Sequence, residues 1–292
     1  MLDENEEPRR PWRKILYEPQ PGYPDNYSGP EFLMELRKNL TVETFTLSES
    51  IGGAFVLQNQ ISIAVLYAAI FALFYTEKLS LSVVSGVTVV TGLVLYLVWL
   101  LTTKLERTWR VLIKEDCGTA AALLAFGFGL SPIVRTLTAT ISSDTVYAMA
   151  TAMFALGLVF YPYRLDAPIA SGAFSLNAST FGAVCLISRL ESTEAAFAML
   201  TLALLAFALW PALRDLLLHT HSASTFHLWH SSLLQTVTSL ALWQLSDAGP
   251  WLWLYWASLA FVCVVCPFLF VVMQRWKSTI HGPWDEAMIA LD

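Results

Sequence analysis

The sequence has little charge for its length. Only 14% of its 292 residues are charged and 56% are apolar, whereas roughly 25% of an ordinary soluble domain is charged. This shortage argues against a water-soluble fold. The formal net charge is −6, so no basic field is present to hold nucleic acid, and we expect no nucleic-acid partner.

Motifs of nucleotide, hydrolytic and metal chemistry are also missing. The sequence has no GxGxxG, P-loop, GxSxG or DxD pattern. The polar head, residues 1–49, is too short and too rich in proline for a doubly wound nucleotide-sugar domain. Cys263 and Cys266 have CxxC spacing but no second pair to complete a zinc site. We therefore predict no catalytic residue, no metal and no cofactor in this chain.

Long uncharged stretches are abundant. A bilayer core about 30 Å thick needs around 20 helical residues, and charge at its centre is costly. Charge-free windows of sufficient length run over residues 50–76, 79–103, 117–134, 145–163, 167–188, 195–213, 216–246 and 248–274. They predict an all-α, polytopic membrane protein of about eight spans, with a head (1–49), a membrane body (50–274) and a tail (275–292). Windows 117–134 and 216–246 are the weakest, because the first is short and the second is rich in polar residues.

The positive charges predict the orientation. If all eight windows cross the membrane, 14 of the 17 Lys and Arg residues lie on the side of the two termini. That side includes the predicted connections 104–116, 164–166 and 214–215. By the positive-inside rule it faces the cytosol, so we expect both termini there.

Several polar residues within or beside the windows have expected roles. Gln58, Asn59 and Gln60, like Asn177, are expected to hydrogen-bond between helices. Asp144 is expected to cap the fourth span and to pair with Arg135. Histidines cluster within the twelve residues that include His219, His221, His227 and His230. A metal-dependent membrane enzyme is the alternative that rests on them, but only Asp215 is close enough to add a carboxylate, and interface-tolerant side chains are the simpler interpretation.

The head and tail contain segments typical of contact surfaces. Three prolines favour an extended path over residues 12–27, and a short amphipathic helix is predicted over residues 30–40. That helix either packs on its own membrane body, docks a partner or rests among lipid headgroups. Trp284 in the tail is either an interfacial anchor or a docking residue.

A family resemblance extends over residues 12–287. In the membrane body it rests on strings such as Ser131-Pro132, Ser143-Asp144-Thr145, Ser175-Leu176-Asn177, Ser188-Arg189-Leu190 and Trp210-Pro211. In the head and tail it includes Tyr17, Pro24, Asp25, Asn26, Tyr27, Phe32, Leu36, His281, Trp284 and Asp285. With these residues the sequence resembles the PIG-C family, a subunit family of the phosphatidylinositol N-acetylglucosaminyltransferase complex, and we expect the head and tail residues to dock partners.

The resemblance implies a function and a location. It implies a multi-pass protein of the endoplasmic reticulum, in the complex that starts glycosylphosphatidylinositol (GPI) anchor synthesis on the cytosolic face. That complex transfers N-acetylglucosamine from UDP-GlcNAc to phosphatidylinositol. The family's chemistry is assigned to a PIG-A-like catalytic subunit, with subunits H, P, Q and Y and a dolichol-phosphate-mannose-synthase subunit as further partners.

We therefore predict a non-catalytic subunit that scaffolds this complex and presents phosphatidylinositol among the membrane lipids. Arg107, Arg110 and Arg164 lie beside spans on the predicted cytosolic side, where a guanidinium can meet a lipid phosphate. The alternative from another class is a small lipid or solute transporter, which would need a polar path or inverted repeats. No repeat between the two halves of the membrane body supports it.

Overall fold

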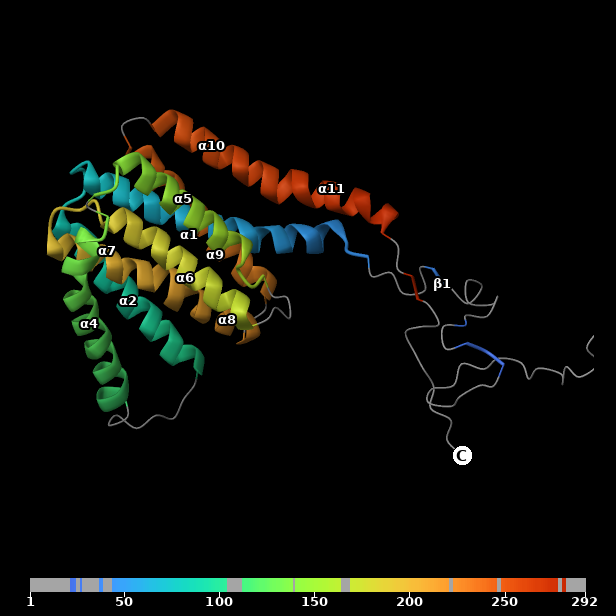
Figure 1. Ribbon diagram of the computed structural model, residues 1–292, viewed down its shortest axis with the longest axis horizontal. Coiled ribbons are helices and arrows are strands. Elements are labelled where there is room, and N and C mark those ends of the chain that lie inside the picture. The colour runs from blue at the N-terminus through green and yellow to red at the C-terminus, as the bar shows by residue number, and fades with distance from the viewer. Residues whose placement is uncertain are drawn as a thin grey trace, which may run out of the picture. The chain divides into compact units, whose positions relative to one another are not determined.

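The computed structural model describes residues 22–24, 27, 37–38, 44–103, 112–138, 140–163, 169–220, 223–245, 248–277 and 280–281. These residues are almost entirely helical (Figure 1), so the predicted all-α membrane fold is confirmed. The chain divides into two compact units, one formed by Leu47–Phe268 and the other by Met1–Thr46 with Leu269–Asp292.

Long helices make up the larger unit and run on into the smaller one. They are α1 (Leu47–Tyr75), α2 (Leu81–Thr103), α4 (Cys117–Thr136), α5 (Ser143–Val159), α6 (Ile169–Ile187), α7 (Thr193–Leu204), α8 (Trp210–Thr220), α9 (Ala223–Trp243), α10 (Ala248–Ala260) and α11 (Cys266–Met273). Short π-helical segments precede α4 (Leu112–Asp116) and join α7 to α8 (Leu205–Leu209) and α10 to α11 (Phe261–Val265). A 3-10 turn, Gln274–Trp276, follows α11.

Five helical runs among the described residues are long and apolar enough to cross a bilayer. They are Leu47–Tyr75, Leu81–Thr103, Lys114–Thr136, Thr193–Leu217 and Gly249–Trp276. The helices of the other predicted windows are shorter, as in α5, or more polar, as in α9. The count of eight spans therefore stays a prediction.

Two serines begin helices in the central part of the chain. Ser142 precedes α5 in an extended conformation, and its Oγ accepts a hydrogen bond from the Thr145 N–H at 3.4 Å. Ser192 caps α7 in the same way. The expectation that Asp144 caps this helix is wrong, because Asp144 already lies in its first turn, where a carboxylate favours the positive end of the helix dipole.

The larger unit is built around α1, α6 and α7. Val146, Ile187 and Met199 are completely buried there, and Tyr67 donates a hydrogen bond from its hydroxyl to the Met199 carbonyl oxygen at 3.2 Å. Helix α5 packs closely on α6, where the Ser175 hydroxyl donates to the Gly157 carbonyl oxygen at 2.6 Å. Small residues thus permit the close helix approach typical of membrane bundles.

Helix α9 packs along α1 and runs in the same direction. Asn59 Nδ2 donates to Ser231 Oγ at 2.8 Å, and further along both helices Ala69 and Leu242 share an apolar cluster. The predicted interhelical hydrogen bonding of Asn59 is confirmed. The parallel course matches the predicted topology, in which the first and seventh spans cross in the same sense.

In the smaller unit the head and the tail meet through backbone and side chains. Strand β1 (Arg37–Lys38) pairs antiparallel with β2 (Ile280–His281), with Arg37 opposite His281. Gln274 brackets Phe45 by donating to its carbonyl oxygen at 2.9 Å and accepting from its N–H. The predicted helix over residues 30–40 is wrong at Arg37 and Lys38, because their backbone groups pair with the tail instead of forming helical bonds.

The extended path predicted for residues 12–27 is also interrupted. The Tyr27 N–H donates to the Pro24 carbonyl oxygen at 2.9 Å, which closes a turn, and the rings of Tyr23 and Tyr27 lie 4.6 Å apart between centroids. Gly22 has a φ of +97°, a conformation that favours glycine.

The predicted connection at residues 214–215 is a second error. Helix α8 continues through both residues to Thr220. A charge-free window ends at any arginine, but Arg214 is satisfied well enough within the protein to be carried inside the helix.

Candidate functional site

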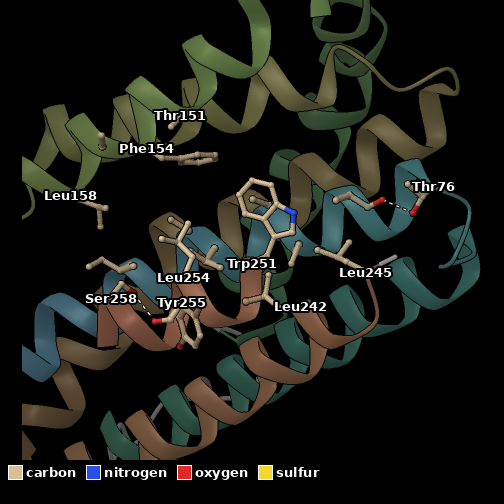
Figure 2. A pocket seen from close by; sticks show the side chains of 17 residues that line it. Thr76, Thr151, Phe154, Leu158, Leu242, Leu245, Trp251, Leu254, Tyr255 and Ser258 are labelled. Atoms are coloured by element: carbon tan, nitrogen blue, oxygen red, sulfur yellow. Dashed lines mark hydrogen bonds between the residues drawn. The ribbon is translucent and has the colours of Figure 1, made fainter. Parts of the chain in front are cut away.

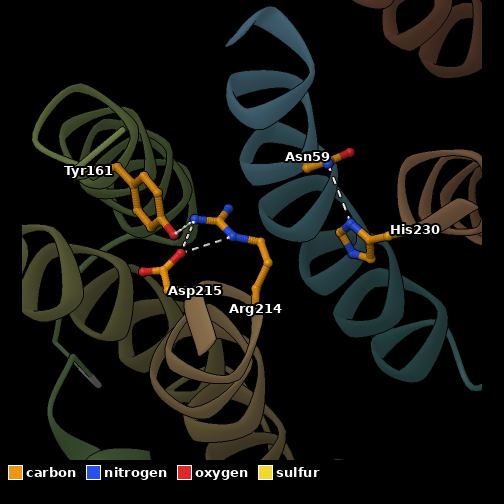
Figure 3. A network of polar contacts seen from close by, with 5 residues as sticks. All are labelled: Asn59, Tyr161, Arg214, Asp215 and His230. Atoms are coloured by element: carbon orange, nitrogen blue, oxygen red, sulfur yellow. Dashed lines mark hydrogen bonds and ion pairs between the residues drawn. The ribbon is translucent and has the colours of Figure 1, made fainter. Parts of the chain in front are cut away.

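Arg214 is the most deeply buried charged residue in the described part of the chain. Its side chain is 2% exposed and donates from Nη2 to the Tyr161 hydroxyl at 2.5 Å and to Asp215 Oδ1 at 2.9 Å. Figure 3 shows the guanidinium lying between these two groups. Its Nη1 nitrogen is enclosed by protein without a hydrogen-bond partner among the residues that the structure describes.

The sequence positions this cluster where helices end. Tyr161 follows the last turn of α5, outside the helix, and Arg214 lies near the end of the α7–α8 run. Burial raises the pKa of Tyr161 to about 12, while the Arg214 charge lowers it and the Asp215 charge raises it. The phenol is therefore neutral at physiological pH and accepts from the guanidinium. The Tyr163 hydroxyl donates to the Leu158 carbonyl oxygen at 2.7 Å, which ties the same turn to α5.

An apolar groove begins one turn before Tyr161. It has a volume of about 750 Å³ and lies among α1, α5, α9 and α10 (Figure 2). Phe154 and Leu158 line it from α5, and Trp251 and Leu254 line it from α10. Polar groups are few at its surface, because the Tyr255 hydroxyl is engaged with Ser62 at 2.8 Å.

A polar cluster lies inside the bundle beside this groove. Gln58 and Asn59 of α1 are 0% and 1% exposed, and the Asn59 amide nitrogen lies 3.4 Å from His230 Nδ1 (Figure 3). The His230 ring also packs on Trp210, with 4.7 Å between centroids. His230 is therefore directed at α1 and α8.

The metal alternative finds no ligand set in the described residues. None of them forms a group of three or more His, Cys, Asp or Glu side chains that could hold an ion. The side chains of His219, His221 and His227 lie outside the described part of the chain.

The other end of α6 has a different arginine arrangement. Arg189 donates to the backbone carbonyl oxygens of Thr138 and Ile141, and Arg135 donates to that of Glu191. The expected pairing of Arg135 with Asp144 is not among the contacts of the described residues, since Arg135 binds the turn before α7. Both arginines hold connections between helices, whereas Arg214 contacts a phenol and a carboxylate.

Most of the predicted site residues cannot be placed. The lipid-phosphate candidates Arg107, Arg110 and Arg164 lie outside the described residues, and so do Tyr17, Asp25, Asn26, Phe32, Leu36, Trp284 and Asp285. Pro24 and Tyr27 share the turn in the head, and the His281 backbone pairs with Arg37. The Arg214 cluster was missed because its members are 53 residues apart, and the one available signal was an arginine next to an aspartate at the end of an uncharged window.

The fold and the site define a polytopic helical membrane protein with a lipid-sized apolar groove and a buried arginine near its mouth. Over residues 12–285 the chain matches the family described as phosphatidylinositol N-acetylglucosaminyltransferase. It belongs to that family, and the resemblance read from its residues is confirmed.

Named relatives cover nearly the whole chain. The PIG-C subunit of phosphatidylinositol N-acetylglucosaminyltransferase from Bos taurus is 34% identical over 96% of this chain and 94% of its own length. The PIG-C subunit from Homo sapiens is 33% identical with the same coverage. The GPI2 subunit from Schizosaccharomyces pombe is 27% identical over 96% of this chain and 87% of its own length. No solved structure matches the chain. These relatives give no support to the transporter alternative.

Proposed function

We propose that this chain is a non-catalytic membrane subunit of the complex that transfers N-acetylglucosamine from UDP-GlcNAc to phosphatidylinositol, and that it holds the lipid acceptor. The names of its relatives support membership of the complex. The apolar groove among α1, α5, α9 and α10 is the observation that carries the lipid-holding role.

The groove has the size and the lining that an acyl chain needs. Its volume of about 750 Å³ falls in the range of roughly 300–1,000 Å³ found for small-molecule sites. Its walls present aliphatic and aromatic carbon, which suits an acyl chain better than the exposed head of a sugar nucleotide. A chain lying there is held by area burial alone, so the specificity for inositol phosphate must come from the headgroup end.

Basic groups are placed at that end by the sequence. Leu158 lines the groove, and the segment that follows it contains Tyr161, Tyr163 and Arg164. Arg214 fixes this segment through Tyr161. We propose that Arg164, with Arg107 and Arg110 on the same predicted side, meets the lipid phosphate by charge-assisted hydrogen bonds.

The proposal places the chain in the endoplasmic reticulum membrane with both termini in the cytosol, where the UDP-sugar is found. The concentration of Lys and Arg on the side of the termini supports this orientation. Protease added outside sealed microsomes should cleave tags at both ends, and protection of either tag would contradict it.

The sugar transfer itself is proposed to belong to a PIG-A-like catalytic subunit. The proposed complex also contains subunits H, P, Q and Y and a dolichol-phosphate-mannose-synthase subunit. Docking is proposed for the head and tail residues named above, such as Tyr17 and Trp284. Transfer activity in this chain purified alone would overturn the non-catalytic role.

A groove-filling variant tests the lipid-holding role. Ala155 lines the groove on α5, whereas Ala152 on the same helix is also exposed but does not. We expect Ala155→Trp to lower the yield of N-acetylglucosaminyl-phosphatidylinositol by about tenfold in complexes of normal composition, and Ala152→Trp to leave it unchanged. Dioctanoyl phosphatidylinositol, whose short chains need less of the groove, should restore part of the loss.

The headgroup end has a separate test. Arg107→Glu, Arg110→Glu and Arg164→Glu each reverse one charge that is proposed to meet the phosphate. If all three variants retain full transferase output, the proposed phosphate contacts are wrong. If Ala155→Trp is also without effect, the lipid-holding role fails as a whole.

A further inference from the structure

Helix α9 has a second polar face, which points away from α1. Its inner face bonds to α1 through Ser231 and through Thr238, whose hydroxyl lies 3.5 Å from the Ser62 carbonyl oxygen. The outer face is formed by residues three or four positions apart, which lie on one side of a helix. It consists of Ser232, Gln235, Thr236 and Ser239.

This outer face lines a hollow of about 420 Å³ between α9 and α10. Trp243 of α9 and Trp256 of α10 border it, and their side chains are 66% and 48% exposed. Gln235 Nε2 and Ser239 Oγ are enclosed there without a hydrogen-bond partner among the described residues. Thr236 satisfies its own hydroxyl by donating to the Ser232 carbonyl oxygen at 2.8 Å, but a glutamine amide needs a partner from elsewhere.

The register of α9 on α1 places Gln235 deep in the membrane body. Ser231 lies beside Asn59 and Thr238 beside Ser62, so Gln235 is level with the middle of α1, a span that runs over Leu47–Tyr75. From the start of α9 to Gln235 the helix rises about 18 Å at roughly 1.5 Å per residue. Lipid headgroups do not reach that depth, and an acyl chain has no hydrogen-bonding group for an amide. The occupant must be a polar group carried by protein.

We propose that the outer face of α9 binds a transmembrane helix of another subunit, which presents a small hydrogen-bonding residue to Gln235. The Gln235 side chain is half-buried, so a rotamer change brings its amide to the mouth of the hollow. A second copy of this chain is a poor occupant, because a twofold interface would set one hollow against the same hollow. The inference rests on membership of the complex and is independent of the lipid-holding role.

The full chain, tagged and expressed in cells that lack their own copy, provides the test. Gln235→Leu removes the amide at nearly constant volume and suits lipid at least as well, so the chain itself should accumulate and melt normally. We expect the co-purified amount of one membrane subunit to fall three- to tenfold, the ratio for one interhelical hydrogen bond of about 0.6–1.4 kcal/mol. Gln244→Leu makes the same exchange at an exposed position after α9, outside the hollow, and should change nothing.

A photo-crosslinking residue at Thr236 identifies the occupant in an otherwise native chain. We expect one discrete adduct with a membrane subunit of the complex. Adducts with a second copy or with lipid alone would overturn the inference, and so would full subunit recovery with both Gln235→Leu and the hollow-filling Ser239→Trp. Loss of subunits separates this result from the groove variant, which acts on complexes of normal composition.

Discussion

Helices α1 and α4 are both long and apolar enough to span a bilayer, yet the protein uses them differently. In the most apolar stretch of α1, 61% of the residues are buried, against 6% in α4. Helix α1 carries buried polar groups such as Asn59 and Ser62, whereas α4 exposes Phe126 and Leu123. Hydropathy alone does not separate the two helices.

The difference teaches where specificity resides in this fold. Apolar residues pack as well against lipid as against each other, so they hold α4 in the membrane without selecting a neighbour. Inner helices are selected by polar contacts and by small residues that permit close approach. The inner region should therefore respond strongly to substitution and the outer region weakly, unless the outer region is covered by another protein of the complex.

The largest expected difference is between two tyrosines. Tyr67 of α1 is 2% exposed and packs on Phe154 and Phe207. Tyr67→Ala should cost about 3–5 kcal/mol of stability, as for other buried aromatic residues. Tyr96→Ala on α2, where the ring is 37% exposed, should cost about 1 kcal/mol or less. Steric-trap unfolding in detergent measures both, and equal losses would contradict the inner-outer distinction.

Close helix approach gives the next difference. A Cβ atom added to Gly157 would lie 2.2 Å from Ser179 Oγ, whereas one added to Gly86 on α2 would meet nothing within 4 Å. Gly157→Ala should destabilise the bundle by about 1–3 kcal/mol through overpacking. Gly86→Ala should be neutral or stabilising by up to about 1 kcal/mol, because alanine favours helix.

Ser179→Ala tests the cause of that loss. It removes the hydroxyl that the new methyl group would strike, so the double variant should be more stable than the sum of the single losses predicts. Strict additivity would place the strain elsewhere between α5 and α6.

Much of this architecture could be predicted from the sequence. The window 79–103 agrees with α2 (Leu81–Thr103), and Asn59 does bond across helices. Charge and length report these features because bilayer thickness and desolvation act on each helix separately. The comparison of α1 with α4 could not be foreseen, since which helices lie inside depends on packing between segments distant in the chain.

The errors have the same origin. Arg214 ended a window in the sequence, but Tyr161, 53 residues earlier, accepts its hydrogen bond and allows α8 to continue. Arg37 and Lys38 form a strand because they pair with Ile280 and His281. No local pattern of residues reports a partner so far along the chain.

The smallest expected difference concerns the hydroxyls of Tyr161 and Tyr96. Tyr161→Phe leaves the buried Arg214 guanidinium with one acceptor fewer, which should cost about 1–3 kcal/mol, the penalty for an unmet hydrogen bond to a charged group. Tyr96→Phe removes a 3.1 Å bond to Asp116 at an exposed site and should cost less than about 0.5 kcal/mol. The pKa of Tyr161 is raised from 10.0 to about 12, so its phenol is neutral in both the folded and the unfolded chain below pH 10. The difference between the variants should therefore be constant from pH 6 to 9 and shrink only as the unfolded phenol ionises above pH 10. A difference that already declines between pH 6 and 9 would mean that another group, such as Asp215, controls the guanidinium.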